Sequence, residues 1–230
     1  MRRWPEVVIF DCDGVLVDSE MISLARTRSA LARLGLDLSE GEARDRFLGI
    51  SAGSIQEIAE RALGAPLPID FQGQLTREIL ADFELGLRGV EGIGEAISKL
   101  DARVCVASSS SLARIRASLG IVGYANLFEP NIFSAADVAS GKPEPDIFLH
   151  AARRLEADPE SCLVIEDSAP GVTAARRANM TVFGFTGGAH ARSAGYGAGL
   201  ISAGAELVFD NMRELPGLID GTATRSRHGS

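Results

Sequence analysis

Two aspartates follow an apolar run near the start of the chain, in the sequence Val7-Val8-Ile9-Phe10-Asp11-Cys12-Asp13-Gly14. A buried strand over 7–10 would present Asp11 and Asp13 at its carboxyl end, where parallel α/β sheets bind their ligands. Gly14 permits a sharp turn at that point. One acid after a strand is commonly a solvated loop residue, but two acids and a glycine together indicate a reactive or metal-binding site.

Four consecutive serines, Ser108–Ser111, follow a second apolar run at Val104–Ala107. A hydroxyl group at a strand end can donate a hydrogen bond to a phosphate oxygen. Ser108 comes directly after the run, so it is the first candidate for phosphate binding, with Ser109 beside it. Ser110 or Ser111 would equally suit the N-cap of a following helix, which is the plainer explanation of this serine run on its own.

The chain contains only two lysines against 21 arginines. One of them, Lys142, stands between Gly141 and Pro143 in a stretch typical of a rigid turn. A compact ammonium group suits a phosphate as a point charge where a wide guanidinium group does not fit. A loop lysine is commonly just solvated, but a lysine at this position in an arginine-rich chain predicts phosphate binding.

A second pair of acids, Glu166 and Asp167, follows the apolar run Leu163–Ile165. Magnesium prefers hard oxygen ligands, commonly one or two carboxylates together with substrate phosphate and water. Asp11 and Asp167 can provide those carboxylates if their strands are neighbours in the sheet. The two acidic strand ends therefore predict a magnesium site.

Short apolar runs alternate with amphipathic stretches along most of the chain, which predicts a mostly parallel, Rossmann-like α/β sheet with helices on both faces. The predicted strands are Val7–Phe10, Val104–Ala107, Ile132–Phe133, Leu163–Ile165, Thr181–Phe185 and Leu207–Phe209. The predicted helices between them include Leu112–Leu119, Pro145–Leu155 and Gly171–Ala178. The glycine-rich stretch Gly184–Gly204 is expected to be a loop.

One region, from residue 19 to residue 87, breaks this alternation because it contains helical patterns and no convincing strand. Apolar residues at helical spacing cover Met21–Leu34, Ile55–Leu63 and Leu75–Leu85. Ser39 followed by Glu42 matches a capping box, and Gly86–Gly92 is typical of a return hinge. We therefore expect a catalytic core formed by 1–18 and 88–220, an inserted helical domain at 19–87, and a flexible tail at 221–230.

The composition is that of a globular protein, with 46% hydrophobic and 23% charged residues. A net charge of −8 gives no reason to expect a nucleic acid or an anionic membrane as partner. No apolar run approaches the roughly 18 residues of a membrane span. The odd count of cysteines (Cys12, Cys105 and Cys162) indicates reduced thiols, and together with first residues unlike a signal peptide it predicts a cytoplasmic location.

In this order, the four elements carried by Asp11, Ser108, Lys142 and Asp167 resemble the haloacid dehalogenase superfamily. The resemblance is to the subgroup that contains β-phosphoglucomutase and sugar-phosphate phosphatases, and the helical insertion resembles the cap of that subgroup. It extends over nearly the whole chain, to about residue 220, and the motifs are specific only in combination. The resemblance implies a phosphohydrolase that acts on a small phosphorylated metabolite such as a sugar phosphate.

The resemblance also implies a role for each residue. Asp11 is similar to the nucleophile that forms an aspartyl-phosphate, and Asp13 is similar to the general acid that protonates the leaving oxygen and then activates water. The phosphate-binding group would be Ser108, Ser109 and Lys142. The implied ligands of Mg²⁺ are Asp11, the backbone carbonyl of Asp13, and Asp167, with Glu166 in support.

Other activities known in the superfamily fit these residues less well. True dehalogenases need no metal and lack the second aspartate of the first motif, so Asp13, Glu166 and Asp167 argue against that class. Phosphonoacetaldehyde hydrolases use a cap lysine, and residues 19–88 contain none. A non-catalytic binding protein on this fold would not need the complete set of acids and lysine.

A sugar-phosphate mutase remains the open alternative. In β-phosphoglucomutase an arginine shortly after the glycine turn of the cap binds the distal phosphate, and a histidine follows the first motif. Here Phe47–Ser54 contains no arginine and Ser23 falls where the histidine would be, which favours a phosphatase, although Arg46 could substitute. Substrate contacts from the insertion are expected among residues that could equally be ordinary surface positions: Glu20, Ser23, Arg46, Ser51 and Arg77.

Overall fold

Six strands form one parallel sheet in the computed structural model, which describes residues 4–228. The strands are β1 (Val7–Phe10), β2 (Arg103–Ser108), β3 (Ile132–Ser134), β4 (Cys162–Glu166), β5 (Thr181–Phe185) and β6 (Leu207–Phe209). Their order across the sheet is β3-β2-β1-β4-β5-β6, and every neighbouring pair is parallel. The predicted Rossmann-like sheet is confirmed, and all six predicted strands are present.

The strand order reverses beside β1, because the chain passes from β1 through β2 to β3 and then returns to place β4 on the other side of β1. The register aligns Phe10 with Val106 on one side and with Ile165 on the other. The residues that follow these positions therefore leave the sheet at the same edge. An open α/β sheet binds its ligand at such a switch point.

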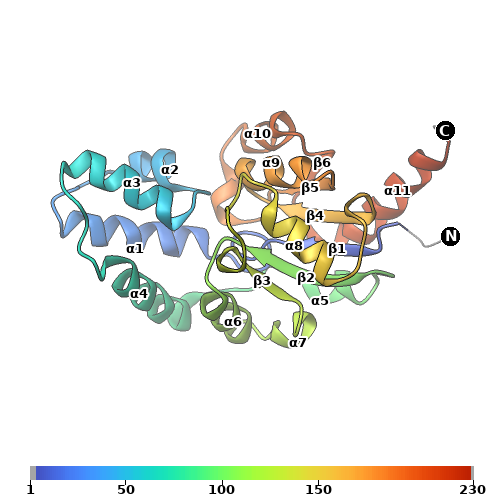
Figure 1. The fold of residues 1–230 in the computed structure, drawn as a ribbon, viewed down its shortest axis with the longest axis horizontal. Coiled ribbons are helices and arrows are strands. Elements are labelled where there is room, and N and C mark those ends of the chain that lie inside the picture. Colours follow the sequence, from blue (N-terminus) through green and yellow to red (C-terminus); the bar gives the residue numbers. More distant parts are fainter. Residues whose placement is uncertain (1–3, 229–230) are drawn as a thin grey trace.

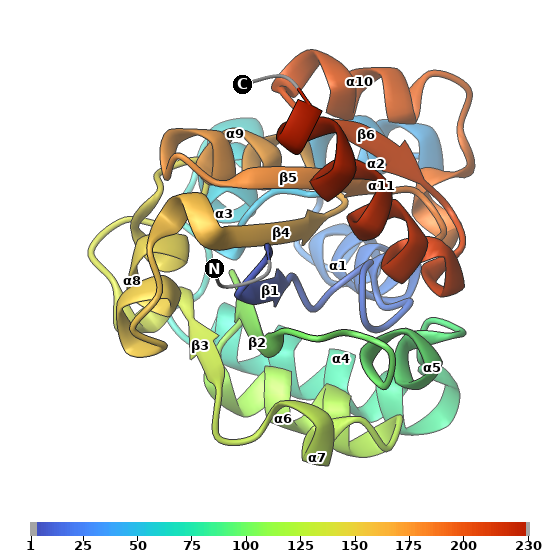
Figure 2. The ribbon, with the colours of Figure 1, turned by 90° about the vertical axis from the view of Figure 1, so that its right-hand side faces the viewer.

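Helices cover both faces of the sheet, as Figure 2 shows. The clusters of buried side chains place α8 (Asp146–Arg154), α9 (Ala169–Arg177) and α10 (Tyr196–Ala203) on one face. The other face carries α5 (Ile93–Ile97), α6 (Leu112–Ile121), α7 (Ala125–Phe128) and α11 (Leu215–His228). Since both faces are buried, the central strands consist almost entirely of apolar residues.

Four helices, and no strand, occupy the segment between β1 and the hinge that precedes α5. They are α1 (Glu20–Ala32), α2 (Glu40–Phe47), α3 (Ala52–Leu63) and α4 (Phe71–Gly86), and they lie together beyond one end of the sheet (Figure 1). The predicted capping box at Ser39 and Glu42 is present at the start of α2. The expected domain boundaries at 18 and 88 stay a prediction.

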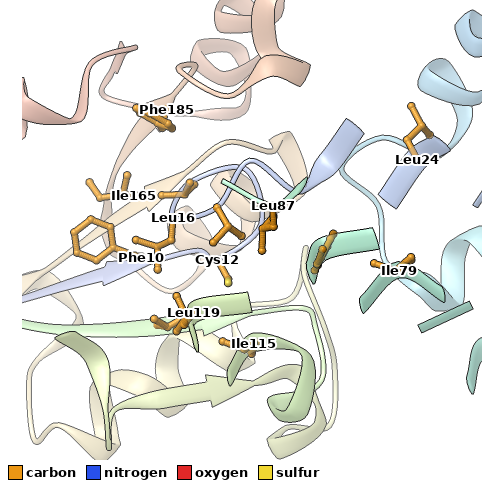
Figure 3. Close-up of a cluster of buried hydrophobic side chains, with 14 of the residues drawn as sticks. Phe10, Cys12, Leu16, Leu24, Ile79, Leu87, Ile115, Leu119, Ile165 and Phe185 are labelled. Carbon is orange, nitrogen blue, oxygen red and sulfur yellow. The ribbon is translucent and has the colours of Figure 1, made fainter. Parts of the chain in front are cut away.

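Two connecting segments lead into and out of these four helices, and they run side by side. The backbone N–H of Asp18 donates to Arg88 O at 2.9 Å, and that of Val90 donates to Leu16 O at 2.9 Å. One continuous apolar cluster crosses the junction, from Phe10 and Leu16 to Leu24 of α1 and Ile79 of α4 (Figure 3). This shared packing holds the helices over the carboxyl edge of the sheet.

Two expectations differ from the structure. The stretch Gly184–Gly204 was expected to be a loop, but it contains a short 3₁₀ helix, η3 (Ala189–Arg192), and the whole of α10. Only short irregular segments connect these elements. Its glycines permit close packing: a Cβ on Gly184 would lie 2.9 Å from the Leu200 side chain of α10.

The second difference concerns the tail expected at 221–230, which begins inside α11. Buried Leu215 and Ile219 anchor that helix against the sheet, so residue 220 is not an element boundary. Residues 229 and 230 lie outside the described residues. No helix in the described part of the chain combines the length and apolarity needed to cross a membrane.

Candidate active site

Lys142 lies at the centre of the switch-point site, between two of the predicted acids. Its Nζ donates to Asp11 Oδ1 at 2.6 Å, to Glu166 Oε1 at 2.6 Å and to the Ala107 carbonyl at 3.2 Å. The ammonium also lies 5.0 Å from the centre of the Phe148 ring, which belongs to the buried face of α8. Residues from three strand ends and one loop thus meet at a single buried cation.

Burial and charge act in opposite directions on this group. Burial raises the pKa of Asp11 well above its ordinary value, against the lowering effect of Lys142, and the carboxylates of Glu166 and Asp167 raise it further. Burial by itself would lower the pKa of Lys142, but the Asp11 and Glu166 carboxylates raise it, so the lysine stays charged. Two carboxylates contact this ammonium group and Asp167 lies near it, so the acids around Lys142 outnumber the cation.

Glu166 is fixed by the turn that follows β4. Its Oε2 accepts from the backbone N–H of Ser168 at 2.8 Å and from Ser168 Oγ at 2.9 Å, while Oε1 faces Lys142. Ser168 also caps α9, accepting from the Gly171 N–H at 3.1 Å. A Cβ on Gly171 would overlap the Glu166 carboxylate, so the glycine is what lets α9 begin so close to the acid.

Asp13 is held by a different set of donors. Ser19 Oγ and the Arg114 Nη2 donate to its Oδ1 at 2.5 and 3.0 Å, and Ser110 Oγ donates to Oδ2 at 2.7 Å. Burial by itself would raise the pKa of Asp13, but the Arg114 charge and the hydroxyl donors outweigh it and hold that pKa below its ordinary value. In this arrangement Asp13 is a carboxylate.

Arg114 also joins α6 to the helices above the sheet edge. The same Nη2 donates to Ser23 Oγ of α1 at 3.0 Å, and the guanidinium lies 5.3 Å from the centre of the Phe83 ring in α4. Its Nε is buried and has no hydrogen-bond partner. The sequence analysis predicted neither Arg114 nor Ser110 as a donor to Asp13. Of the two serines expected to cap the following helix, Ser111 is the N-cap of α6.

Asp167, the other predicted metal ligand, lies against a histidine that the sequence analysis missed. His190 Nε2 is 2.7 Å from Asp167 Oδ2, yet the approach does not have the direction of a hydrogen bond. Burial raises the pKa of Asp167 well above its ordinary value, and Glu166 adds to the effect. Burial lowers the pKa of His190, so its imidazole is neutral.

The donor set fits a hard cation. Among residues 4–228 no three Asp, Glu, His or Cys side chains gather into a ready-made metal cage. Magnesium, however, is usually bound by one or two carboxylates, with water and substrate phosphate completing its six ligands. Neighbouring carboxylates raise the pKa of both predicted ligands: Glu166 and Asp167 act on Asp11, and Glu166 and Asp13 act on Asp167. A cation between Asp11 and Asp167 would offset this repulsion.

A cavity of about 480 Å³ opens above these residues. Ser108 and Ser109 both line it: Ser108 is buried and accepts from the Ser110 N–H at 3.2 Å, whereas Ser109 is exposed. The structure therefore brings the predicted phosphate-binding residues to the same cavity as Asp11 and Lys142, as the predicted strand ends required.

Three of the five candidates from the helical segment line the cavity, namely Glu20, Ser23 and Ser51. Burial, followed by the nearby Asp13 and Asp167 carboxylates, raises the pKa of Glu20 to about 7. Ser51 also caps α3, accepting from the Ser54 N–H at 3.2 Å.

Arg46 and Arg77 lie outside the cavity and are exposed. In α2 the buried residues are Ala43 and Phe47, and Arg46 is exposed although it lies only three positions after Ala43. The position of Arg46 therefore does not support the idea that it could replace the arginine that binds the distal phosphate in a mutase.

The rest of the helical lining is neutral. Among the described residues of α1–α4 that line the cavity, Glu20 is the only ionisable one; the polar remainder are hydroxyls and amides at Ser23, Thr27, Ser51, Ser54, Gln56, Gln72 and Thr76. Apart from Lys142, the only cation in the described lining is Arg114, which is paired with Asp13. The far part of the cavity thus offers hydrogen bonds but little positive charge.

The chain thus has a doubly wound parallel sheet with buried carboxylates and a lysine at its switch point, which is the place where α/β enzymes of this class bind their ligands. Residues 5–179 match the family described as haloacid dehalogenase-like hydrolase, and the chain belongs to this family. The resemblance seen in the sequence is confirmed.

Three relatives illustrate the match. The 6-phosphogluconate phosphatase of Escherichia coli (strain K12) is 31% identical over 186 residues, which cover 80% of this chain and 84% of that protein. A haloacid dehalogenase-like protein of unknown function from Agrobacterium tumefaciens has 36% identity and a TM-score of 0.81, with 95% and 99% of the two chains covered. An Asp-to-Asn variant of CbbY from Rhodobacter sphaeroides, solved with xylulose 1,5-bisphosphate, has 26% identity and a TM-score of 0.75, with 91% and 96% covered.

Proposed function

We propose that this protein is a Mg²⁺-dependent phosphatase that hydrolyses the monophosphate ester of a small metabolite, in particular a sugar phosphate. The observation that carries the proposal is the position of Lys142 Nζ, 2.6 Å from both Asp11 and Glu166, beside Asp167 at the carboxyl edge of the sheet. The relationship to a 6-phosphogluconate phosphatase supports the same activity.

In the proposed reaction an Asp11 carboxylate oxygen attacks phosphorus, and the ester oxygen leaves with its bonding electrons and takes up a proton. The product is an aspartyl-phosphate, which divides one difficult displacement into two easier ones. Attack by water on the phosphorus then releases inorganic phosphate and restores the carboxylate. Lys142 and Ser108, which both line the cavity, are proposed to hold the phosphate oxygens during both steps.

The proposed role of Asp13 follows from its donors. As a carboxylate it can accept a proton from the attacking water, which is the second half of the reaction. To donate a proton to the leaving oxygen in the first half, it must first lose the stabilisation from Arg114, Ser19 and Ser110. We therefore infer that substrate binding rearranges these contacts.

Asp11 and Asp167 are proposed to hold the cation, together with the Asp13 backbone carbonyl, and Glu166 is proposed to support them. When bound, Mg²⁺ supplies positive charge that offsets the repulsion between carboxylate and phosphate. Glu166 contributes by fixing Lys142, since its Oε1 faces the ammonium and its Oε2 is held by Ser168.

The four helices α1–α4 are proposed to form a cap domain at 19–87 that selects the substrate. Their neutral hydroxyl and amide lining favours an uncharged, hydroxyl-rich body attached to one phosphate. A mutase would need a second phosphate site, and besides Lys142 the described lining of the cavity contains one cation, Arg114, to form it. A cytoplasmic location is proposed as well, supported by the three cysteines, which are free and buried.

The test is phosphate release from a panel of sugar and polyol phosphates by metal-stripped protein, with and without added Mg²⁺. Asp11→Asn should abolish release, because an amide is a poor nucleophile. Asp45→Asn, an exposed change on α2 outside the cavity, is the matched control and should be unaffected. Full activity in excess EDTA, or an active Asp11→Asn variant, would refute the proposal.

Product analysis separates the phosphatase from the mutase. The protein is incubated with β-glucose 1-phosphate, Mg²⁺ and a catalytic amount of glucose 1,6-bisphosphate. Free phosphate is the expected main product if this substrate is accepted. Sustained accumulation of glucose 6-phosphate with little free phosphate would establish the mutase reaction.

A further inference from the structure

His190 is a buried imidazole for which the proposed reaction has no direct use. Its side chain is 1% exposed, and it follows β5 in the 3₁₀ helix η3. Nε2 lies 2.7 Å from Asp167 Oδ2, and neither ring nitrogen has a hydrogen-bond partner. A buried polar ring without partners is costly, so its position beside an acid of the site needs an explanation.

The space for this contact is provided by two glycines. A Cβ on Gly14 would overlap Asp167 Oδ2 and lie 2.8 Å from His190 Cε1. A Cβ on Gly188 would lie 2.7 Å from His190 Cε1 and Nδ1. The turn after β1 and the turn after β5 thus both lack side chains where the imidazole meets the carboxylate.

The backbone around His190 is fixed independently of its ring. The N–H of Ala189 donates to Asp18 Oδ1 at 3.0 Å, and Arg44 Nη2 of α2 donates to the His190 carbonyl at 3.0 Å. The Tyr196 ring packs edge-on at 5.4 Å between centres. These contacts hold the backbone and pack against the ring, so that Nε2 stays beside Asp167 Oδ2, where a change in ring orientation would let the Nε2–H donate to it.

We propose that His190 is a positioning residue for Asp167: its Nε2–H holds Oδ2 and leaves the other carboxylate oxygen for the cation. The proposal rests on the proposed function, in which Asp167 is a metal ligand. Groups that hydrogen-bond to a ligating side chain fix its orientation, and their loss typically weakens metal affinity about 10–100-fold. The neutral ring would then carry its proton on Nε2.

The test compares His190→Leu, which removes the donor, with His190→Gln, whose amide N–H can reach a similar position. His150→Leu is the control, since His150 packs against Phe133 on α8, away from the cavity. Mg²⁺ binding to the substrate-free protein is measured by calorimetry, and the Mg²⁺ dependence of phosphate release is measured beside it.

We expect His190→Leu to weaken Mg²⁺ binding about 10–100-fold, His190→Gln to restore part of it, and the control to bind like wild type. The Mg²⁺ concentration for half-maximal rate should rise while the rate at saturating Mg²⁺ changes little. If His190→Leu does not fold, Gly188→Ala displaces the same ring and should give the same weakening.

The outcomes that overturn the proposal are distinct from failure of the proposed function. Unchanged Mg²⁺ affinity in His190→Leu, or in Gly188→Ala where the first variant is unfolded, overturns this proposal and leaves the phosphatase intact. Equal weakening by His190→Gln and His190→Leu, without any rescue, overturns the donor role. Wild-type protein that binds no Mg²⁺ overturns both the metal site and the role of His190.

Discussion

Replacing Arg114 with methionine tests whether this arginine keeps Asp13 ionised. Methionine keeps an apolar stem against Phe83 and removes only the charged group. The side chains of the Arg114–Asp13 pair are 18% and 12% exposed, so solvent screens their contact only weakly. A hydrogen bond to a charged group contributes about 1.5–3 kcal/mol. With Ser19 and Ser110 still donating, we expect the free energy of unfolding at pH 7 to fall by about 2–3 kcal/mol.

The pH dependence of that loss gives the sharper test. The pKa of Asp13 is held below its ordinary value in the folded protein, so ionised Asp13 stabilises the fold above the unfolded-state pKa of about 3.9. This stabilisation is lost as the pH falls through the folded-state pKa. Without Arg114, burial is less well offset and the pKa of Asp13 lies higher, so the variant recovers stability as Asp13 takes up a proton on acidification. The difference between variant and wild type should therefore shrink as the solution is acidified.

Urea unfolding at several pH values between 3.9 and 7 measures this difference. Arg116→Met is the matched control on the same helix, because Arg116 pairs with Glu129 at the surface, with side chains 51% and 37% exposed. That change should cost less stability than Arg114→Met at every pH tested, because solvent screens an exposed pair. Equal losses in the two variants, or a deficit of Arg114→Met that does not change with pH, would refute the assignment of Arg114 as the counter-ion of Asp13.

Three further changes probe the site. Asp13→Asn should lose more turnover with sugar phosphates than with p-nitrophenyl phosphate, because p-nitrophenolate needs less protonation to leave; equal losses would remove Asp13 as the acid. Gly171→Ala should lower the free energy of unfolding by about 1–3 kcal/mol in urea by pushing Glu166 off its donors, whereas Gly120→Ala, in an open helical position, should be neutral or stabilising. Lys142→Gln should abolish phosphate release and raise the pKa of Asp11 further, seen as a loss of stability at pH 7 that diminishes on acidification; a loss independent of pH would contradict that reasoning.

The part of the site that could be predicted from sequence is the part fixed by strand ends. Asp11, Ser108 and Glu166 each stand at or directly after the end of an apolar run, and parallel strands bring those ends to one edge of a sheet. Lys142 was found by a different signal, its rarity in an arginine-rich chain. Neither inference required knowledge of how any helix is oriented.

Arg114 and His190 could not be predicted in this way, because their partners are distant in sequence and are set by helix and turn orientation. Arg114 contacts an acid 101 positions away, and the periodicity of α6 does not say whether an arginine with a long apolar stem points to solvent or into a cavity. His190 lies in the glycine-rich stretch that was predicted to be a loop. A clue was available in Gly188, which makes room for the His190 ring close to the backbone.

The arginines of α2 show that a difference of two positions decides which residue makes a contact that the sequence does not reveal. Arg44 and Arg46 are two positions apart, and at 3.6 residues per turn they lie on nearly opposite sides of the helix. Arg46, near the glycine turn, is one of the five residues predicted as substrate contacts, but it is exposed and lies outside the cavity. Arg44 instead reaches the carbonyl of His190. An arginine of the proposed cap thus binds the turn that carries His190. The short 3₁₀ helix η3 therefore contacts α2 through its backbone and Asp167 through the His190 ring.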